Sequence, residues 1–392
     1  MTYPPGSQIL LVSTVISFIE WFEQGIIELL LQEFGCQVHI ACNCDYLADT
    51  SPERTQEFMA RARDAGVVFH NIPFARSPFH WANFRAYRML QALLDKEHFS
   101  VFHCHTPLAS ILTRLAAQKV RKKGAKVLCT SHGFHFFQGA SWRNWLLYYP
   151  IEKYCASLTD ILITINQEDF ALAHTHFHAG QVQYVPGVGV DIERYSRLPD
   201  RRAEKRRELG LSEHAIVLLG VGELNENKNH RIILEALAQI QESDVHFVLA
   251  GKGPLADELL SQAKAFGLKD QFHSLGFRRD VSELYKLADI MVFPSLREGL
   301  PLSVMEGMAA GLPFVASRIR GICDLILDER GGFLCQPKDS RQFADAIQKL
   351  LHMPQLRENF GNFNRIRVQA FSRQAVEADM KKIYGTILTP LK

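Results

Sequence analysis

The sequence lacks several features that would place it in a common class of protein. Its eight cysteines include no Cys-x-x-Cys pair, so the spacing of zinc sites and of redox motifs is absent. A disulfide scaffold is not expected in a chain of 392 residues. No run reaches the roughly 18 apolar residues that a membrane-spanning helix needs. These absences favour a globular protein of the reducing cytosol.

An excess of charge of one sign is also missing. The chain has 44 lysines and arginines against 42 aspartates and glutamates, which gives a formal net charge of +2. A dedicated nucleic-acid binder derives much of its affinity from neutralising phosphates. We therefore expect no nucleic-acid partner.

The N-terminal stretch MTYPPGSQILLVSTVISFIEWF lacks the basic region that opens a signal peptide. Its apolar run is interrupted by Ser13, Thr14 and Ser17 and is closed by Glu20. We interpret this stretch as a buried strand and not as a secretion signal.

A complete Gly-x-Gly-x-x-Gly fingerprint does not occur after any predicted strand. The run AIVLLGVGELNENKNH enters a loop with Gly220, Gly222 and Lys228, but Leu224 and Asn225 occupy the positions where the third glycine should appear. The missing glycine disfavours an NAD-dependent dehydrogenase. The residues alone leave two readings open, namely a phosphate-binding loop and a tight turn with a solvated lysine.

Short β-rich runs alternate with helical patterns along the whole chain. The expected strands are QILLVS, QVHIAC, VVFHNI, VFHCH, KVLCTS, DILITI and QVQYVP in the first half, and AIVLLGVG, VHFVLAG, QFHSLG, DIMVFPS, PFVAS and GGFLCQP in the second. Such alternation indicates βαβ units and parallel sheets that are buried on both faces. Two series of this kind predict an α/β protein with two Rossmann-like domains that face one another.

The helical patterns lie between the expected strands. They cover residues 20–33, 52–65, 83–96 and 110–121, the polar run DRRAEKRRELG, which we expect as an exposed helix, and residues 373–387. PGVGVD, residues 186–191, is the expected hinge between the domains. The predicted domains are residues 1–187 and residues 188–372, and the segment 373–392 would cross back to brace the first domain.

Two glutamates, Glu298 and Glu306, lie on either side of a Gly-Leu-Pro turn in SLREGLPLSVMEG. This turn follows the expected strand DIMVFPS, at the strand end where open α/β sheets bind ligands. Pro301 fits the first turn of a helix, and the helical rise places Glu306 on the order of 10 Å from Glu298. The two carboxylates of a retaining glycosidase lie only roughly 5 Å apart. The pair instead suits the binding of two hydroxyl-bearing rings joined by a diphosphate, unless both glutamates are solvated surface residues.

Several motifs in order now resemble one family. FPSLREGLPLSVMEGMAAGLPFVAS resembles the E-x7-E signature of the family-4 retaining glycosyltransferases, enzymes of the two-domain GT-B fold. The resemblance covers most of the chain and includes GVGELNENKN, AGKGPL, SLGFRRDVSELYKLADIMVFPS, GICDLILDERGGFLCQPKD and the hinge PGVGVDIERY. In the first half, VFHCHTPLASILTRLAA and CTSHGFHFF resemble bacterial members that build exopolysaccharide or capsule.

The resemblance implies a role for each matching residue. Glu298 would contact the hydroxyls of the donor sugar, Glu306 the ribose of the nucleotide, and Lys228 the donor diphosphate. The donor site expected on this basis consists of Gly222, Asn225, Lys228, Arg278, Glu298, Gly299, Leu300, Pro301, Leu302, Ser303 and Glu306. The expected donor is a UDP-sugar, and the resemblance implies neither a metal ion nor a further cofactor.

Histidines of the first half supply the remaining candidates. His132, in TSHGF, would end a strand and face the cleft, where family members carry a histidine that contacts the donor sugar or the transition state. We expect it to be catalytic together with Lys228 and Glu298, the alternative being a packed histidine at a strand end. His103 and His105 are interpreted as structural or acceptor-side residues and not as metal ligands. HTHFH, residues 174–178, is interpreted as surface because i, i+2 and i+4 do not share one helix face.

The sequence departs from the family pattern at Glu223. Most members have arginine directly after the second glycine of this loop, and an acid beside a diphosphate would be repulsive. Glu223 must therefore point away or meet another group. Asn225, Asn227 or Arg278 would then supply the missing hydrogen-bond donor.

Two stretches indicate contact with a membrane surface. Basic residues cluster between positions 119 and 126, and WRNWLLYYP, residues 142–150, combines aromatic side chains with a cation. Interfacial enzymes use such combinations on anionic headgroups. The alternative is a solvated helix end followed by a core helix.

The sequence therefore predicts a retaining glycosyltransferase. It would move a sugar from a nucleotide-diphosphate sugar to a glycan or lipid-linked glycan acceptor of surface polysaccharide, in the cytoplasm at the cytosolic face of the membrane. A nucleotide-sugar epimerase of the same fold would consume the donor without an acceptor. A non-catalytic nucleotide-binding module would bind nucleotide without turnover. These two alternatives stay open.

Overall fold

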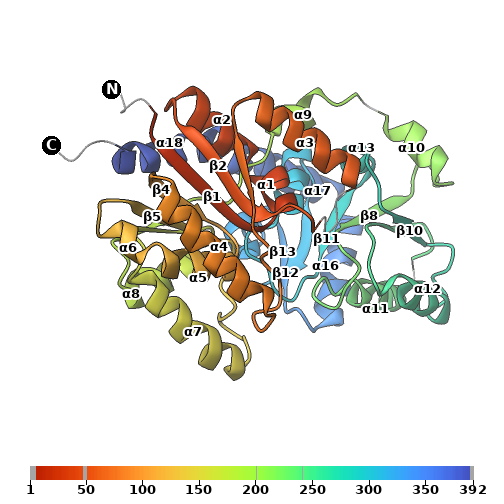
Figure 1. Ribbon diagram of the computed structural model, residues 1–392. Coiled ribbons are helices and arrows are strands. Elements are labelled where there is room, and N and C mark those ends of the chain that lie inside the picture. Colours follow the sequence, from red (N-terminus) through yellow and green to blue (C-terminus); the bar gives the residue numbers. More distant parts are fainter. Residues whose placement is uncertain (1–5, 47–50, 200, 241, 389–392) are drawn as a thin grey trace. The chain divides into compact units, whose positions relative to one another are not determined.

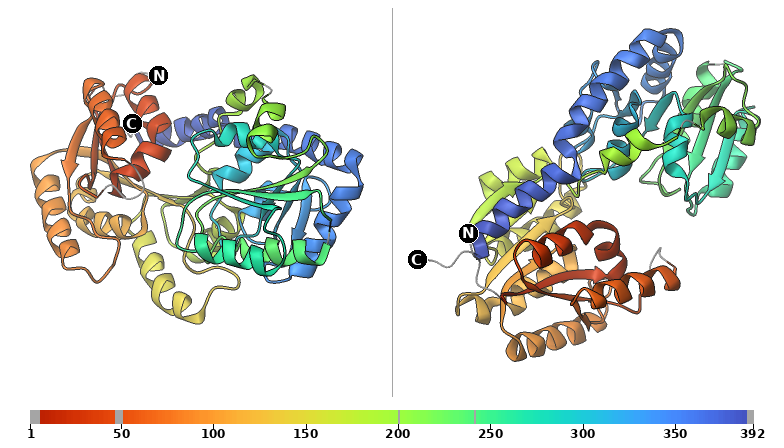
Figure 2. Two further views of the ribbon diagram at one scale, coloured as in Figure 1. Left: turned by 90° about the vertical axis from the view of Figure 1, so that its right-hand side faces the viewer. Right: turned by 90° about the horizontal axis from the view of Figure 1, so that it is seen from above.

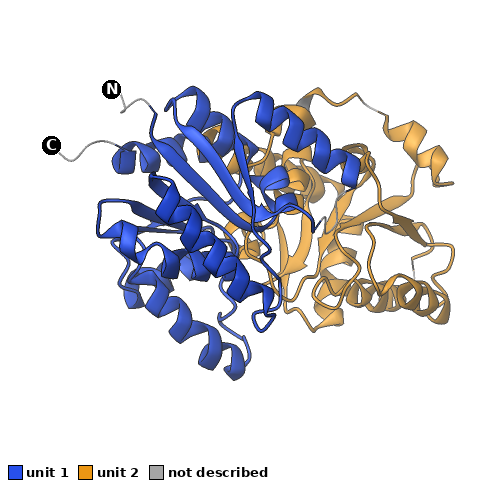
Figure 3. Cartoon of the chain, viewed as in Figure 1, with its two compact units in different colours: residues 1–188, 376–392 blue, residues 189–375 orange. Residues whose placement is uncertain are grey.

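The computed structural model describes residues 6–46, 51–199, 201–240 and 242–388 (Figure 1). The chain divides into two compact units (Figure 3). Unit 1 comprises Met1–Val188 and Val376–Lys392, and unit 2 comprises Gly189–Ala375. Each unit contains one parallel sheet with helices on both of its faces (Figures 1 and 2).

Unit 1 is built on a seven-stranded sheet with the order β3-β2-β1-β4-β5-β6-β7. Its strands are β1 (Gln8–Val15), β2 (Gln37–Asn43), β3 (Val68–Asn71), β4 (Phe99–Cys104), β5 (Lys126–Ser131), β6 (Ile161–Thr164) and β7 (Gln181–Tyr184). Every neighbouring pair is parallel. All seven strands predicted for the first half are thus confirmed.

The sequence of strand β1 is apolar without alternation because both of its faces are buried. Ile9 and Leu11 belong to one buried cluster, whereas Leu10 and Val12 belong to another. Successive side chains point to opposite faces of a sheet, so both faces of β1 are covered by helices. The first cluster also receives side chains from the last helix of the chain.

The helices of unit 1 depart from prediction in two places. They are α1 (Ile16–Phe22), α2 (Gln24–Gln32), α3 (Pro52–Asp64), α4 (Ala82–Lys96), α5 (Pro107–Ala116), α6 (Gln118–Arg121), α7 (Trp142–Ala156) and α8 (Gln167–His176). The N-terminal stretch is a strand only as far as Val15, because Ile16–Phe22 is helical. The continuous helix predicted over residues 20–33 is interrupted at Glu23, whose backbone has φ −115° and ψ 5°.

Helix α18 (Arg373–Leu388) continues from unit 2 into unit 1. Its residues Val376, Met380, Ile383 and Tyr384 lie in a core cluster of unit 1. The Tyr384 hydroxyl also lies 2.6 Å from Nδ1 of the buried His103 on β4. The C-terminal helix is therefore part of the core of unit 1.

The chain passes between the units at residues 188–189 and again at 375–376. Near the first crossing Gly187 and Gly189 both have φ +75°, a left-handed conformation that favours glycine. A Cβ at Gly189 would stand 2.6 Å from the Cα of Arg373, so the second segment packs directly against the first. Val190 and Ser372 form a parallel bridge there.

Unit 2 is built on a six-stranded parallel sheet with the order β10-β9-β8-β11-β12-β13. Its strands are β8 (Ile216–Val221), β9 (Val245–Ala250), β10 (Phe272–Gly276), β11 (Ile290–Phe293), β12 (Phe314–Ser317) and β13 (Gly332–Cys335). Its helices are α9 (Ile192–Arg197), α10 (Arg202–Glu208), α11 (Arg231–Ile240), α12 (Ala256–Ala265), α13 (Val281–Leu287), α14 (Leu302–Ala310), α15 (Ile322–Leu325), α16 (Ser340–His352) and α17 (Pro354–Arg367), followed by a 3₁₀ turn at Val368–Phe371. The six strands predicted for the second half are confirmed.

The predicted helix is confirmed as α10, but it is not exposed along its whole length. Lys205 and Arg206 are buried. The Lys205 ammonium lies 2.7 Å from Asp280 and 2.9 Å from Glu208, and the Arg206 guanidinium lies 3.0 Å from Asp289. These carboxylates neutralise the two cations, which is why a polar face can be buried here.

Among the described residues, no helix combines the length and the hydropathy that crossing a bilayer requires.

Candidate functional site

Lys228 and Glu298 meet beyond the carboxyl ends of the two central strands of the sheet of unit 2. Lys228 follows β8 and Glu298 follows β11, and these strands are neighbours although they are far apart in the chain. This is the topological switch point, where open parallel sheets place their ligands. Lys228 Nζ donates to Glu298 Oε1 at 2.7 Å, with 20% of the lysine side chain and 13% of the glutamate side chain exposed. The two residues predicted for diphosphate and sugar binding therefore form one partly buried charge pair.

The loop that carries Lys228 is held by three asparagines. Asn225 Oδ1 accepts from the backbone N–H of Lys228 at 3.0 Å. Asn229 has φ +52°, and its amide donates to the carbonyls of Pro294 and Pro337. Asn227 donates to the carbonyl of Arg297 at 2.9 Å. These bonds tie the β8 loop to the β11 loop, so Lys228 and Glu298 are positioned by backbone contacts as well as by their own charge.

Glu223 finds a partner within its own loop. It is exposed, and its Oε2 accepts from Asn225 Nδ2 at 2.8 Å. Asn225 also accepts from the backbone N–H of Lys228, so Glu223 helps to orient the side chain that holds this turn. The carboxylate therefore meets a different group, which is one of the two outcomes expected from the sequence.

Glycines bring the β8 and β9 loops into direct backbone contact. A Cβ at Gly251 would stand 1.8 Å from the carbonyl oxygen of Gly222, and one at Gly253 would stand 2.3 Å from that of Leu224. Gly222 itself has φ +155°. Larger residues would push the two loops apart, so the glycines of GVGEL and AGKGPL serve this close approach.

The loop after β11 ends in an uncapped helix N-terminus. Pro301 is the N-cap of α14 and provides no side-chain hydrogen bond. The first backbone N–H groups of a helix, here those of Leu302 and Ser303, have no acceptor within the helix. Arg320 Nε donates to the carbonyl of Glu298 at 3.2 Å and braces the loop. N–H groups without an acceptor, in a loop whose Glu298 is paired with Lys228, make this end of α14 suited to an anion.

Glycines allow α14 and the loop before it to pack closely against their neighbours. Gly321 has φ +72°, and a Cβ there would stand 1.9 Å from the carbonyl oxygen of Gly299. Leu300, in the same loop, is buried. A Cβ at Gly307 would stand 2.4 Å from Met291 Sδ, so Gly307 is the small residue that allows α14 to lie on the sheet.

Glu306 lies on α14 and is held by two tyrosines. Tyr285 donates to Glu306 Oε2 at 2.9 Å, and a second hydrogen bond comes from the Tyr195 side chain. Burial raises the pKa of the Glu306 carboxyl, while the two hydroxyls act in the opposite direction. The carboxylate can accept a ribose hydroxyl, and the tyrosines would then fix its orientation.

Arg278 is the predicted donor-site residue that the structure does not join to the others. Its guanidinium lies 2.6 Å from Asp280 and 2.8 Å from Glu208. These carboxylates raise the pKa of Arg278. A contact with phosphate would require it to leave both partners.

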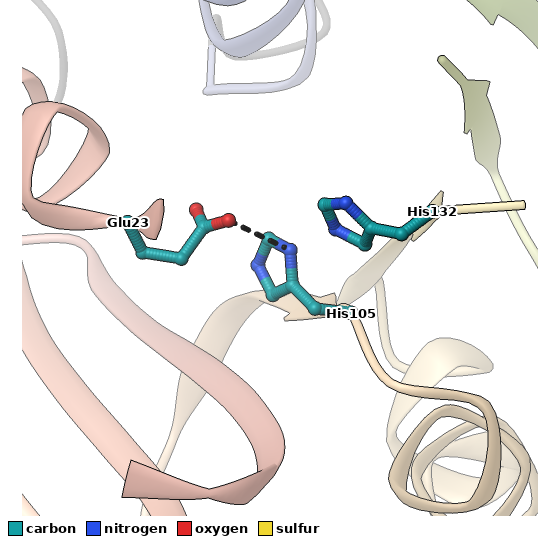
Figure 4. A group of neighbouring side chains, drawn as sticks. All are labelled: Glu23, His105 and His132. Atoms are coloured by element: carbon teal, nitrogen blue, oxygen red, sulfur yellow. Dashed lines mark ion pairs between the residues drawn. The ribbon is translucent and has the colours of Figure 1, made fainter. Parts of the chain in front are cut away.

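His132 lies in unit 1 beside two further titratable side chains, Glu23 and His105 (Figure 4). His105 Nδ1 lies 3.2 Å from Glu23 Oε1. Burial lowers the pKa of His132 to about 4 and raises that of Glu23 to about 8. His132 is therefore a neutral imidazole near pH 7, which can accept a hydrogen bond or a proton.

Among the other histidines of unit 1, His103 has a structural role and three lie on the surface. His103 is fully paired, with Nδ1 on the Tyr384 hydroxyl and Nε2 on the Thr130 hydroxyl at 2.7 Å, and burial lowers its pKa to about 3. His174, His176 and His178 are exposed, as predicted.

Sequence reasoning missed Glu23, Tyr195 and Tyr285. No pattern singles out one glutamate within an amphipathic helix or two tyrosines far from the glutamate that they hold. The run IEWFEQGIIELL contains Glu20, Glu23 and Glu28, so the sequence does not distinguish Glu23 from its neighbours.

Helix α7 is apolar on two sides. Trp145, Tyr148 and Tyr149 pack against the core of unit 1. On the outside Trp142 and Leu146 are each 70% exposed, and Leu147, Ile151 and Tyr154 are also exposed. These exposed side chains form an apolar patch on the outer side of α7, and patches of this kind often mark interaction sites.

The basic cluster near residues 119–126 is largely paired. Lys119 lies 3.0 Å from Asp95, and both Arg121 and Lys126 lie near Asp160. Lys122 and Lys123 are exposed. These two lysines are the cations of the cluster best placed to reach an anionic surface.

Comparison with known proteins places the chain in a family. Residues 201–367 match the family described as glycosyl transferases group 1, and residues 29–194 match the Glycosyltransferase Family 4. The chain is 36% identical over 377 residues to EpsD of Bacillus subtilis (strain 168), a match that covers 95% of this chain and 93% of EpsD. The name of EpsD assigns it provisionally to the glycosyltransferases.

A second relative is named by its reaction. The chain is 32% identical over 269 residues to the UDP-Gal:alpha-D-GlcNAc-diphosphoundecaprenol alpha-1,3-galactosyltransferase of Escherichia coli, covering 67% of this chain and 68% of that protein. The crystal structure of Anabaena Alr3699/HepE in complex with UDP and glucose has a TM-score of 0.78, at 18% identity, covering 97% of this chain and 100% of HepE. That similarity shows a shared fold. The chain belongs to the family-4 glycosyltransferases, with the GT-B fold.

Proposed function

We propose that the protein is a retaining glycosyltransferase. It moves a sugar from a nucleotide-diphosphate sugar, a UDP-sugar in the first instance, to a hydroxyl of a lipid-linked glycan in surface polysaccharide biosynthesis. The observation that carries the proposal is the Lys228–Glu298 pair, 2.7 Å apart at the switch point of unit 2 and beside the uncapped N-terminus of α14.

The donor half of the proposal rests on charge and hydrogen bonding. The Lys228 ammonium and the N–H groups of Leu302 and Ser303 would bind the diphosphate, whose negative charge grows as the sugar leaves. Glu298 would accept from sugar hydroxyls, and Glu306 from the ribose. Fixed charges of this kind stabilise a leaving group without a metal ion, so we assign no metal to the donor diphosphate.

The proposed reaction keeps the anomeric configuration. In our proposal no protein side chain attacks the anomeric carbon. The acceptor oxygen forms its bond to that carbon from the face that the leaving phosphate vacates, and the departing phosphate oxygen takes the acceptor proton. His132 would bind the transition state as a neutral imidazole.

The acceptor half rests on the named relative and on α7. The Escherichia coli relative is named for transfer to a sugar on diphosphoundecaprenol, with an alpha linkage in its product. The outer side of α7 carries exposed Trp142, Leu146 and Tyr154, with Arg143 and Lys153 on the same helix. Aromatic and aliphatic side chains flanked by cations suit the interface of an anionic bilayer. We propose that unit 1 binds the cytosolic membrane surface through α7, where it meets a lipid-linked acceptor.

Donor hydrolysis tests the donor half. The protein is incubated with UDP-, GDP- and ADP-sugars without acceptor, and nucleotide release is compared between wild type, Glu298→Ala and Glu258→Ala, an exposed control on α12. We expect slow release from one donor, abolished in Glu298→Ala and unchanged in the control. Equal release by the Glu298 variant would overturn the assignment of that residue.

The same assay separates the alternatives. Formation of an epimerised sugar would replace the transferase by an epimerase. Nucleotide-induced thermal stabilisation without any turnover, with or without acceptor, would favour a binding module.

A further inference from the structure

The connection between β3 and α4 carries some of the most exposed aromatic side chains of unit 1. Phe79 is 89% exposed, Phe84 is 74% exposed and Trp81 is 70% exposed. Single exposed apolar residues are ordinary on protein surfaces, but three large ones within six residues form a patch that needs an explanation. We call residues 76–88 the aromatic segment; it comprises the end of this connection and the first two turns of α4.

Buried residues in and beside the aromatic segment hold its backbone in place. Ile72 and Phe74, just before the segment, lie in a core cluster of unit 1. Asn83 is buried, and its Oδ1 accepts from the backbone N–H of Ala75 at 2.9 Å, while its Nδ2 donates to the carbonyl of Ser77 at 2.8 Å. The aromatic rings are therefore presented to solvent by a fixed backbone, although core positions lie next to them in the sequence.

The charge of the aromatic segment has one sign. No acidic residue occurs in the sequence between Asp64 and Asp95, whereas the segment contains three exposed arginines, Arg76, Arg85 and Arg88. Asp95 itself is paired with Lys119 at 3.0 Å. Aromatic side chains next to several cations, with no acid among them, suit the interface of an anionic bilayer.

The aromatic segment and the exposed side chains of α7 lie at one end of unit 1. Helices α4 and α7 pack into the same core cluster, and α5 contacts both of them (Figure 1). Each helix begins after the carboxyl end of a parallel strand, α4 after β3 and α7 after β5. Four strand spacings of about 4.8 Å separate β3 from β5, so the two apolar groups are about 19 Å apart across the sheet. A sugar or a nucleotide is too small to cover both groups, whereas a lipid surface can do so.

We propose that the aromatic segment is a second membrane contact of unit 1. Its three aromatic side chains enter the interface of the bilayer, and its arginines bind the phosphates of anionic lipids. The inference rests on the membrane contact of α7 under the proposed function but uses none of its residues. A single contact on one helix would leave unit 1 free to turn about it, whereas two separated contacts fix which end of the unit meets the bilayer. His132 follows β5 at this same end, so a lipid-linked acceptor would be presented beside it.

Flotation of the full-length protein with vesicles of phosphatidylglycerol and phosphatidylcholine tests the proposal. The double change Phe79→Ser, Phe84→Ser should lower binding by about 100-fold, since burial of each large apolar side chain contributes about tenfold or more. Phe266→Ser, at a 40% exposed position in unit 2, is the matched control and should leave flotation unchanged. Arg85→Gln with Arg88→Gln should weaken binding to these vesicles at low salt by roughly 25-fold, at about fivefold per cation, and should not change binding to pure phosphatidylcholine.

Quenching of tryptophan fluorescence by brominated lipids locates the segment without a loss of binding. Part of the quenching of the wild-type protein should disappear in Trp81→Phe, which keeps an aromatic ring and should still float. Unchanged quenching in Trp81→Phe, or wild-type flotation by the Phe79, Phe84 double variant, would overturn the proposal and leave the α7 contact in place. Failure of the wild-type protein to float would overturn both membrane contacts, while donor hydrolysis, which needs no vesicles, would still test the transferase separately.

Discussion

Replacing Lys228 by methionine is expected to lower kcat for sugar transfer by about 10²–10³-fold. A preorganised group that stabilises transition-state charge typically contributes this much, and here the charge develops on the leaving diphosphate. Methionine keeps most of the length and the apolar stem of lysine but removes the ammonium that bonds Glu298 at 2.7 Å. The measurement is steady-state transfer with the donor that hydrolysis identifies.

The controls separate catalysis from folding. Only 13% of the Glu298 side chain is exposed, so removing the ammonium leaves a mostly buried carboxylate without its partner and should lower the free energy of unfolding by about 1–3 kcal/mol. Transfer is therefore measured well below the melting temperature of the variant. Lys264→Met, at an exposed position on α12, should leave transfer unchanged. If folded Lys228→Met retained wild-type kcat, Lys228 would not carry leaving-group charge.

Removing the exposed apolar side chains of α7 is expected to lower membrane binding by about 100-fold or more. Burial of one large apolar side chain contributes about 1.5–3 kcal/mol, and each 1.4 kcal/mol is a factor of ten. Trp142 and Leu146 are one helical turn apart and each 70% exposed, so the double change Trp142→Ser, Leu146→Ser removes adjacent contacts without emptying the core. Flotation with vesicles that contain anionic phosphatidylglycerol measures the partition.

Unit 2 provides the matched control for this experiment. Leu260, 47% exposed on α12, is replaced by serine and should not change flotation. Lys122→Gln with Lys123→Gln should weaken binding at low salt but not at high salt, because the contribution of these lysines is screened. Failure of the wild-type protein to float with anionic vesicles at low salt would remove the membrane proposal and leave the donor site untouched.

The strands were predictable because parallel strands that are buried on both faces read as uninterrupted apolar runs. QILLVS and DIMVFPS consist mainly of apolar residues, and both form central strands. Helix boundaries were less predictable near Glu23. The apolar period continues through that residue, so one helix was expected, and only packing explains why the backbone breaks and Glu23 turns inward.

The donor site was predictable in part. The rule that ligands lie beyond the carboxyl ends of parallel strands pointed to Lys228 and Glu298, and the family resemblance assigned their roles. Their direct pairing depends on β8 and β11 being neighbours in the sheet, and the order of the strands cannot be read from the sequence around either residue. The hydrogen bond from the Tyr285 hydroxyl to Glu306 depends in the same way on how α13 packs against α14.

The most direct test of the transferase follows the anomeric proton of the product by NMR. Wild-type protein is mixed with the α-configured UDP-sugar that it hydrolyses and with a short-chain lipid-diphosphate glycan. The account predicts a new glycoside in the α configuration, formed in step with UDP release. A β-configured product would contradict retention. Continued UDP release with no glycoside on any lipid-linked acceptor would contradict the assignment of that acceptor.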